Sequence, residues 1–275
     1  MTGLALTAPA AVGRTIVAEL LERQRLLALY GIGSIVLGLL VVAMIPADPR
    51  TLQGVSVWVK PAKFLFSTAA FALTAAWYYG YVRPERRRSR ALRWSAWTLV
   101  AASAFEIAWI SWQASQGLAS HFNHSSPFYS TMYGLMGIAA LALIGTTLPL
   151  AWEIARRPAQ GLRADFAAAV AIGLVLTFLL GTTLGFYMAG GTGHTVGAAG
   201  GHFPVFGWNR LGGDLRVAHF FGIHAEQAIP LLAFLAAGLG ARMRWAVLAA
   251  GTALYVAVTL GVFFQAVAGR PFLAF

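Results

Sequence analysis

The stretch that decides the fold class is FAAAVAIGLVLTFLLGTTLGFYM, residues 166–188. It holds 23 residues without one charged side chain. An α-helix needs about 20 apolar residues to cross the ~30 Å hydrocarbon core of a bilayer. A helix at the surface of a soluble protein would instead show a polar face, which this stretch lacks. The sequence therefore predicts a transmembrane helix here.

Six further apolar stretches of similar length follow one another along the chain, separated by short polar links. Hydrophobic residues make up 59% of the 275 residues and charged residues only 11%, too few to cover a soluble domain of this size. We expect a cytoplasmic or interfacial segment over residues 1–25 and one all-α membrane domain over residues 26–275. Its seven expected spans cover residues 26–46, 63–82, 94–115, 128–152, 166–188, 217–239 and 245–269.

Lysine and arginine in the links predict how the spans are oriented. With the N-terminus in the cytoplasm, the inside segments hold fourteen of the twenty basic residues and the outside segments six. Cytoplasmic loops of membrane proteins are enriched in these residues. The sequence therefore predicts a multi-pass plasma (inner) membrane protein with a cytoplasmic N-terminus and an extracytoplasmic C-terminus. The net charge of +11 then faces anionic lipid headgroups and does not indicate nucleic acid.

The six histidines all fall on the extracytoplasmic side of this topology. Because the chain has no cysteine, a metal site would use imidazole and carboxylate ligands, whereas a haem would need one or two axial histidines. The segment SHFNH, residues 120–124, does not match a known zinc signature, and an outer loop that caps the fourth span is its alternative interpretation. The predicted metal ligands are His121, His124, His219 and His224, with His202 as a further candidate.

Two acids, Glu106 and Glu226, lie near the middle of the third and sixth expected spans. A charge there costs at least ~2.5–3.5 kcal/mol on insertion scales, so such residues usually face the bundle and have a partner. We expect both to be catalytic or proton-carrying, and a hydrogen bond that ties two helices is the alternative. Arg216, His219 and Glu226 should share one helix face. Pro230, one turn after Glu226, is expected to weaken the helix.

The chain has only two lysines, and both stand in WVKPAKF, residues 58–64, at the outer mouth of the second expected span. Their ammonium groups suit an anionic ligand or a carboxylate partner, and snorkelling toward headgroups is the alternative. The glycine-rich outer link, residues 189–216, has an aromatic second half and is expected to fold back as a lid. The predicted ligand-binding residues are Lys60, Lys63, Gln113, Asn123, Arg210, Asp214, Arg216 and Gln227.

Together these patterns predict an outward-facing pocket of His, Glu, Lys and Arg side chains, for which three functions are open. The first is a membrane enzyme that depends on a metal ion or haem and acts on a lipophilic or anionic small molecule. The second is a proton-coupled transporter of a small anionic solute, in line with buried ionisable groups and a proline-interrupted helix. The third is a membrane sensor or scaffold subunit. The expected partners are the lipid bilayer and a small-molecule ligand from the extracytoplasmic side.

Overall fold

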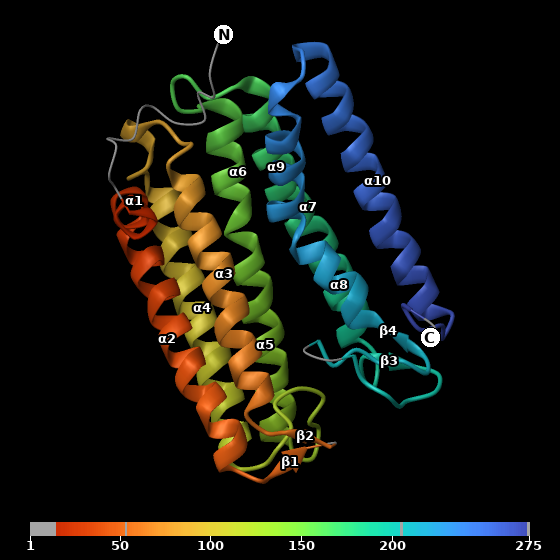
Figure 1. Ribbon diagram of the computed structural model, residues 1–275. Coiled ribbons are helices and arrows are strands. Elements are labelled where there is room, and N and C mark those ends of the chain that lie inside the picture. The colour runs from red at the N-terminus through yellow and green to blue at the C-terminus, as the bar shows by residue number, and fades with distance from the viewer. Residues whose placement is uncertain (1–14, 53, 204–205, 274–275) are drawn as a thin grey trace. The chain divides into compact units, whose positions relative to one another are not determined.

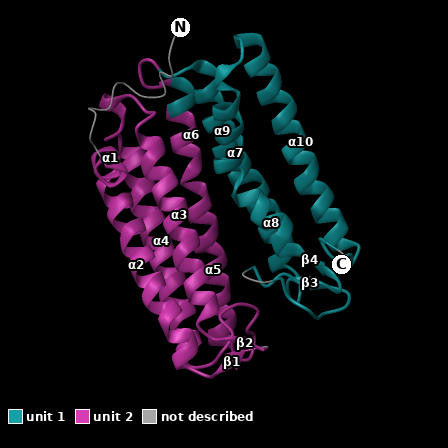
Figure 2. Ribbon diagram, viewed as in Figure 1, with its two compact units in different colours: residues 1–6, 154–156, 162–275 teal, residues 7–153, 157–161 magenta. Residues whose placement is uncertain are grey.

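The computed structural model describes residues 15–52, 54–203 and 206–273, and these are mainly helical (Figure 1). This confirms the all-α class. Within the described residues the chain forms two compact units (Figure 2). The N-terminal unit comprises residues 15–153 and 157–161, and the C-terminal unit comprises residues 154–156 and 162–273. The expectation of a single membrane domain stays a prediction.

The N-terminal unit consists of long helices joined by short links, in which α3 packs along α2 and α4, and α5 packs along α4. A two-residue-per-strand hairpin joins α2 to α3, and a short 3-10 helix (Pro84–Arg86) lies between α3 and α4. Its elements are α1 (Ile16–Arg23), α2 (Arg25–Ala47), β1 (Thr51–Leu52), β2 (Val55–Ser56), α3 (Val59–Tyr79), α4 (Arg90–Ser115), α5 (Pro127–Gly145) and α6 (Thr147–Arg156), whose last three residues are counted with the other unit.

In the C-terminal unit two short consecutive helices, α8 and α9, pack against two long ones, α7 and α10. α7 packs against both α8 and α9, and α10 packs mainly against the same pair. The link between α7 and α8 contains a small antiparallel sheet, in which Thr195 is paired with Asp214. The elements are α7 (Ala164–Ala189), β3 (Thr195–Val196), β4 (Gly213–Asp214), α8 (Leu215–Ile223), α9 (Ala225–Leu235), a 3-10 helix (Ala236–Gly238) and α10 (Ala241–Val267).

Four helical segments of the described chain are long and apolar enough to cross a membrane: α2, α7, α10 and the combined α5–α6 segment (Pro127–Arg156). The pair α8–α9 makes a fifth if its two halves, bent by 55°, form one span. Large apolar side chains such as Leu40 (62% exposed) and Leu254 (65% exposed) point away from the unit cores. Exposed apolar surface of this kind marks contact with a membrane or a partner. The chain therefore has the features of a membrane-embedded all-α protein.

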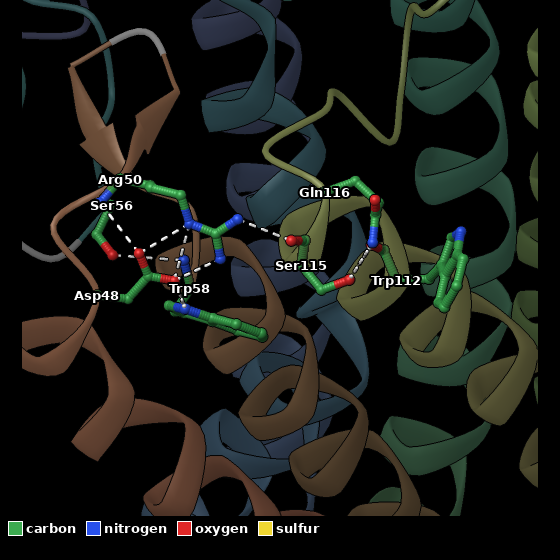
Figure 3. A network of polar contacts seen from close by, with 7 residues as sticks. All are labelled: Asp48, Arg50, Ser56, Trp58, Trp112, Ser115 and Gln116. Atoms are coloured by element: carbon green, nitrogen blue, oxygen red, sulfur yellow. Dashed lines mark hydrogen bonds and ion pairs between the residues drawn. The ribbon is translucent and has the colours of Figure 1, made fainter.

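One polar network fixes the hairpin to the ends of α2, α3 and α4 (Figure 3). The Asp48 carboxylate accepts hydrogen bonds from Arg50 Nη2 at 2.6 Å and from Trp58 Nε1 at 2.8 Å. Arg50 Nη1 donates to the Ser115 carbonyl at the end of α4, at 2.8 Å. The hydrogen bonds from Arg50 and Trp58 hold the pKa of Asp48 well below its ordinary value of 3.8.

Acidification is expected to loosen this network. A carboxyl group whose pKa falls on folding stabilises the fold above its ordinary pKa, and the contribution is lost as the pH drops below about 4. The free energy of unfolding of the wild-type protein should therefore begin to fall below that pH. The Asp48→Asn variant should lack this part of the decrease, and an identical pH profile of stability in both proteins would contradict the role given to Asp48.

Candidate functional site

A helix break in the C-terminal unit forms the first candidate site. The helices α8 and α9 meet at 55° around His224. A break in an apolar helix frees backbone groups that must find partners inside the protein. Tyr255 of α10 donates its hydroxyl to the Phe221 carbonyl, and Thr177 Oγ1 of α7 lies 3.3 Å from the Ile223 carbonyl, to which it donates. Side chains from both neighbouring helices thus satisfy the end of α8.

α7 also holds the start of α9. The Thr177 hydroxyl accepts a hydrogen bond from the backbone N–H of Glu226 at 2.9 Å, so one side chain bonds both sides of the break. Gly173 permits the close approach, because a Cβ at this position would lie 2.8 Å from the Ala225 carbonyl oxygen and 3.1 Å from Glu226 Cα. Gly173 and Thr177 of α7 therefore fix the position of the break against this helix.

The break presents three connected polar side chains. Gln227 Nε2 donates to Glu226 Oε1 at 2.8 Å, and Gln227 Oε1 lies 3.2 Å from His224 Nδ1. Because an amide oxygen only accepts, His224 Nδ1 carries a proton in this arrangement. Glu226 is completely buried (0% exposed). The result is a carboxyl, an amide and an imidazole in one hydrogen-bonded series, a set that can hold and exchange a proton.

His219 lies on the preceding helix, beside α7. A Cβ at Gly185 would come within 3.1 Å of the His219 ring, and His219 Nδ1 has no hydrogen-bond partner among the described residues. The expected stripe of Arg216, His219 and Glu226 is interrupted, since the 55° bend falls between His219 and Glu226. Helical spacing alone does not hold across a break.

The link between α7 and α8 is held by two buried polar residues, Asn209 and Asp214. Asp214 pairs with Arg216 at 2.6 Å and accepts from the Asn209 backbone N–H at 2.8 Å. Burial raises the pKa of Asp214, but the hydrogen bonds and charge of Arg216 outweigh that effect and lower it overall. Asp214 and Arg216 thus stabilise the link itself, and Arg210 is exposed beside the Phe203 ring. Ligand binding by these residues stays a prediction.

A second group of predicted site residues meets in the N-terminal unit. Lys60 Nζ of α3 lies 3.0 Å from His121 Nδ1, and Ser120 Oγ lies 3.1 Å from the same nitrogen. Burial, with the nearby charge of Lys60, lowers the pKa of His121 to about 3, so its ring is neutral near pH 7. Because an ammonium group only donates, His121 Nδ1 accepts a hydrogen bond from Lys60. Lys60 also interacts electrostatically with Glu106 of α4.

Glu106 is buried (4% exposed), and its Oε1 has no hydrogen-bond partner within the described part of the chain. The same holds for Ser103 Oγ, one turn earlier on α4. Buried polar atoms without internal partners are rare and often mark sites that take up a water, a proton or a ligand. Gln113, by contrast, donates to the Ala119 carbonyl at 3.3 Å and closes the link after α4.

The remaining predicted residues of this unit lie near its surface. His124 is exposed, with Nδ1 3.2 Å from Ser130 Oγ. Asn123 donates to the Ala119 carbonyl at 3.2 Å, and Lys63 is exposed on α3. These positions are compatible with contact to an approaching solute, but the structure does not bring them together with Glu106.

The predicted metal site has no support. Within the described residues, no group of three or more His, Asp or Glu side chains could hold a metal ion. His121 Nδ1 is hydrogen-bonded to Lys60 and His224 Nδ1 to Gln227. In each ring one of the two nitrogens that could bind a metal ion is therefore already engaged in a hydrogen bond. The expected ligands are also divided between the units, with His121 and His124 in the N-terminal unit and His202, His219 and His224 in the C-terminal unit.

The Lys60→Met variant is expected to be less stable than the Lys63→Met variant. Loss of the ammonium at Lys60 removes the donor to His121 and the positive charge near Glu106, whereas Lys63 is exposed. Loss of a partner at a buried polar group costs roughly 1–3 kcal/mol. Thermal unfolding in the same detergent measures the difference. Equal transition temperatures would show that the Lys60–His121 contact adds no stability.

Sequence reasoning missed three hydroxyl groups that shape these sites: Ser103, Thr177 and Tyr255. A usable signal existed for Thr177, which lies in a row of small residues four apart on α7 with Gly173, Gly181 and Gly185. Such rows mark close helix contacts in membranes. No comparable pattern marks Tyr255.

The chain has no significant match among protein-family models, curated proteins or solved structures.

Proposed function

We propose that this chain is a proton-coupled membrane transporter of a small anionic solute, with the break between α8 and α9 as its proton-carrying site. The observation that carries the proposal is a buried carboxyl, Glu226, at the start of a helix that is interrupted within an apolar segment. Discontinuous transmembrane helices commonly form substrate and coupling-ion sites in secondary transporters. A helix that only anchors the chain would gain nothing from the break.

The proposed chemistry assigns the proton to Glu226. A neutral carboxyl is less costly than a charged one in an apolar surrounding, so Glu226 binds a proton during transport and releases it into water. Gln227 and Thr177 hold the carboxyl and its backbone in place, and His224 is the next titratable group in the series. Within the C-terminal unit, Arg216 lies at the expected outer end of α8, where its positive charge attracts the anion.

The proposed topology has seven spans, a cytoplasmic N-terminus and a plasma-membrane location. It adds α3 (21 residues) and α4 (26 residues) to the more apolar spans, because both are long enough to cross a bilayer and α3 packs along α2. The arginine distribution supports the orientation.

Since the chain has no cysteine, single cysteines can test this topology. In right-side-out vesicles or intact cells, a membrane-impermeant maleimide should label Ser125→Cys directly and Arg88→Cys only after permeabilisation. Both positions are exposed in the structure. The reverse labelling pattern would invert the orientation, and access to both without permeabilisation would contradict the span count between them.

Transport is tested with purified protein in liposomes that enclose a pH-sensitive dye. Gradients of acetate, lactate and inorganic phosphate are applied as probes, each with and without the protein. At least one anion should acidify the lumen faster in proteoliposomes than in protein-free liposomes. Uptake without proton movement would remove the coupling from the proposal. Absence of both uptake and proton movement for small anions would overturn it.

A further inference from the structure

An apolar groove of about 680 Å³ runs along α10 beside α7 in the C-terminal unit. Residues that recur every three or four positions on one face of α10 line it, and such residues share a helix face. Several of them are alanines, which are too small to fill the space next to α7. The side chains that define its walls include Ile172, Leu248, Ala249, Ala253, Ala257 and Leu260.

The dimensions of the groove indicate what can occupy it. Its lining extends from Trp245 to Leu260, which is roughly 22 Å at the ~1.5 Å rise per residue of a helix. Apart from Thr252 its lining is apolar, which suits a hydrocarbon chain that lies along the helix.

One end of the groove carries groups that suit a lipid headgroup. Trp245 lies there half-exposed, and tryptophan is enriched where membranes meet water. Arg242, in the first turn of α10, is exposed one turn before it. Arg244 is held by Asp165 at 3.2 Å, which leaves Arg242 as the nearest exposed cation on α10. An arginine guanidinium binds phosphate through charge-assisted hydrogen bonds.

We propose that this groove is a phospholipid site, in which one acyl chain lies along the alanine face of α10 and an anionic phosphate lies beside Arg242 and Trp245. The charge at one end and the apolar walls along the rest match the two parts of such a lipid. An acyl chain whose headgroup lies at this end spans about one ~15 Å half of the hydrocarbon core. The groove lining, roughly 22 Å long, is long enough for that chain. This site is independent of the proposed transport activity.

Native mass spectrometry of the delipidated full-length protein, titrated with phosphatidylglycerol or phosphatidylcholine, tests the proposal. The wild-type protein should bind one phosphatidylglycerol more tightly than phosphatidylcholine. Ala253→Trp fills the groove and should weaken binding about tenfold or more, equivalent to ~1.4 kcal/mol. Ala250→Trp is the matched control, because Ala250 is exposed on the same helix outside the groove lining, and it should bind as the wild type does.

A smaller change, Ala257→Leu, covers the case in which Ala253→Trp does not fold, and it should weaken binding in the same direction. Arg242→Gln should abolish the preference for phosphatidylglycerol while one lipid still binds. Equal binding by the Ala253→Trp and Ala250→Trp variants would overturn the site. An unchanged preference in Arg242→Gln would overturn the position of the phosphate. An oxidation-dependent dimer of Ala253→Cys would assign the groove to a second copy instead.

Discussion

Replacing Glu226 by Gln is expected to abolish proton movement coupled to anion uptake and to leave the fold intact. Glutamine keeps the shape of the side chain, and its amide oxygen can still accept the hydrogen bond from Gln227. It cannot bind a proton near neutral pH, so the proton-carrying step is lost. Removal of a group that transfers a proton in the rate-limiting step costs about 100-fold or more. Lumenal acidification in proteoliposomes is the measurement.

Two controls separate this effect from a folding defect. Glu85→Gln changes the same side chain at an exposed position in the link between α3 and α4, and it should transport as the wild type does. In addition, exchange of labelled anion against unlabelled anion needs no net proton movement, so Glu226→Gln should retain it. Proton coupling at the wild-type rate in Glu226→Gln would show that another group carries the proton.

The second large effect is expected at Gly173, where alanine should destabilise the C-terminal unit. Alanine is intrinsically better than glycine in a helix by ~1 kcal/mol. At this position, however, the added Cβ would lie 2.8 Å from the Ala225 carbonyl oxygen, a backbone atom that cannot rotate away. Overpacking of this kind costs about 1–3 kcal/mol, which outweighs the gain in helix propensity. The transition temperature of Gly173→Ala in detergent should therefore fall.

Gly137→Ala is the matched control for this substitution. Gly137 lies inside α5, and apart from its chain neighbours and its own helix backbone no atom comes within 4 Å of a Cβ built there. Only the higher helix propensity of alanine then acts, so this variant should be as stable as the wild type or more stable. Because the displaced atoms adjoin Glu226, Gly173→Ala should also slow proton-coupled uptake, whereas Gly137→Ala should not. Equal stability of the two variants would show that α7 and α9 are not in tight contact.

The positions of the helices could be predicted because apolar runs of membrane length leave few alternatives. The expected span over residues 166–188 corresponds to α7, Ala164–Ala189. Pro230 is expected to weaken the helix, but it lies inside α9 and the chain turns earlier, at His224. The turn lies there because Thr177 and Tyr255 supply the partners for the freed backbone groups, and both are far away in the sequence. The position of a proline in the sequence does not reveal these distant hydrogen-bond partners.

The candidate sites follow the same division between local and distant contacts. The pairing of His224 with Gln227 could be predicted, since residues three apart meet on a helix. The contact of Lys60 with His121 joins positions 61 residues apart, and no spacing rule reveals it. Asp214 and Arg216 were expected to face a ligand because they are charged and lie in an outer link. They also form an ion pair that stabilises the link, since buried charges need partners wherever they lie, and ligand binding by them stays a prediction.

The two halves of the interrupted segment also bear on how the protein is made. α8 has 9 residues and α9 has 11, so at ~1.5 Å per residue neither half alone reaches across the ~30 Å hydrocarbon core. Neither half can therefore form on its own as an early inserted unit. Both should be assembled late in biogenesis, once α7 and α10 offer the hydroxyl groups that complete their backbone bonding. A ribosome-bound chain that stops before α10 should accordingly leave this segment open to proteases.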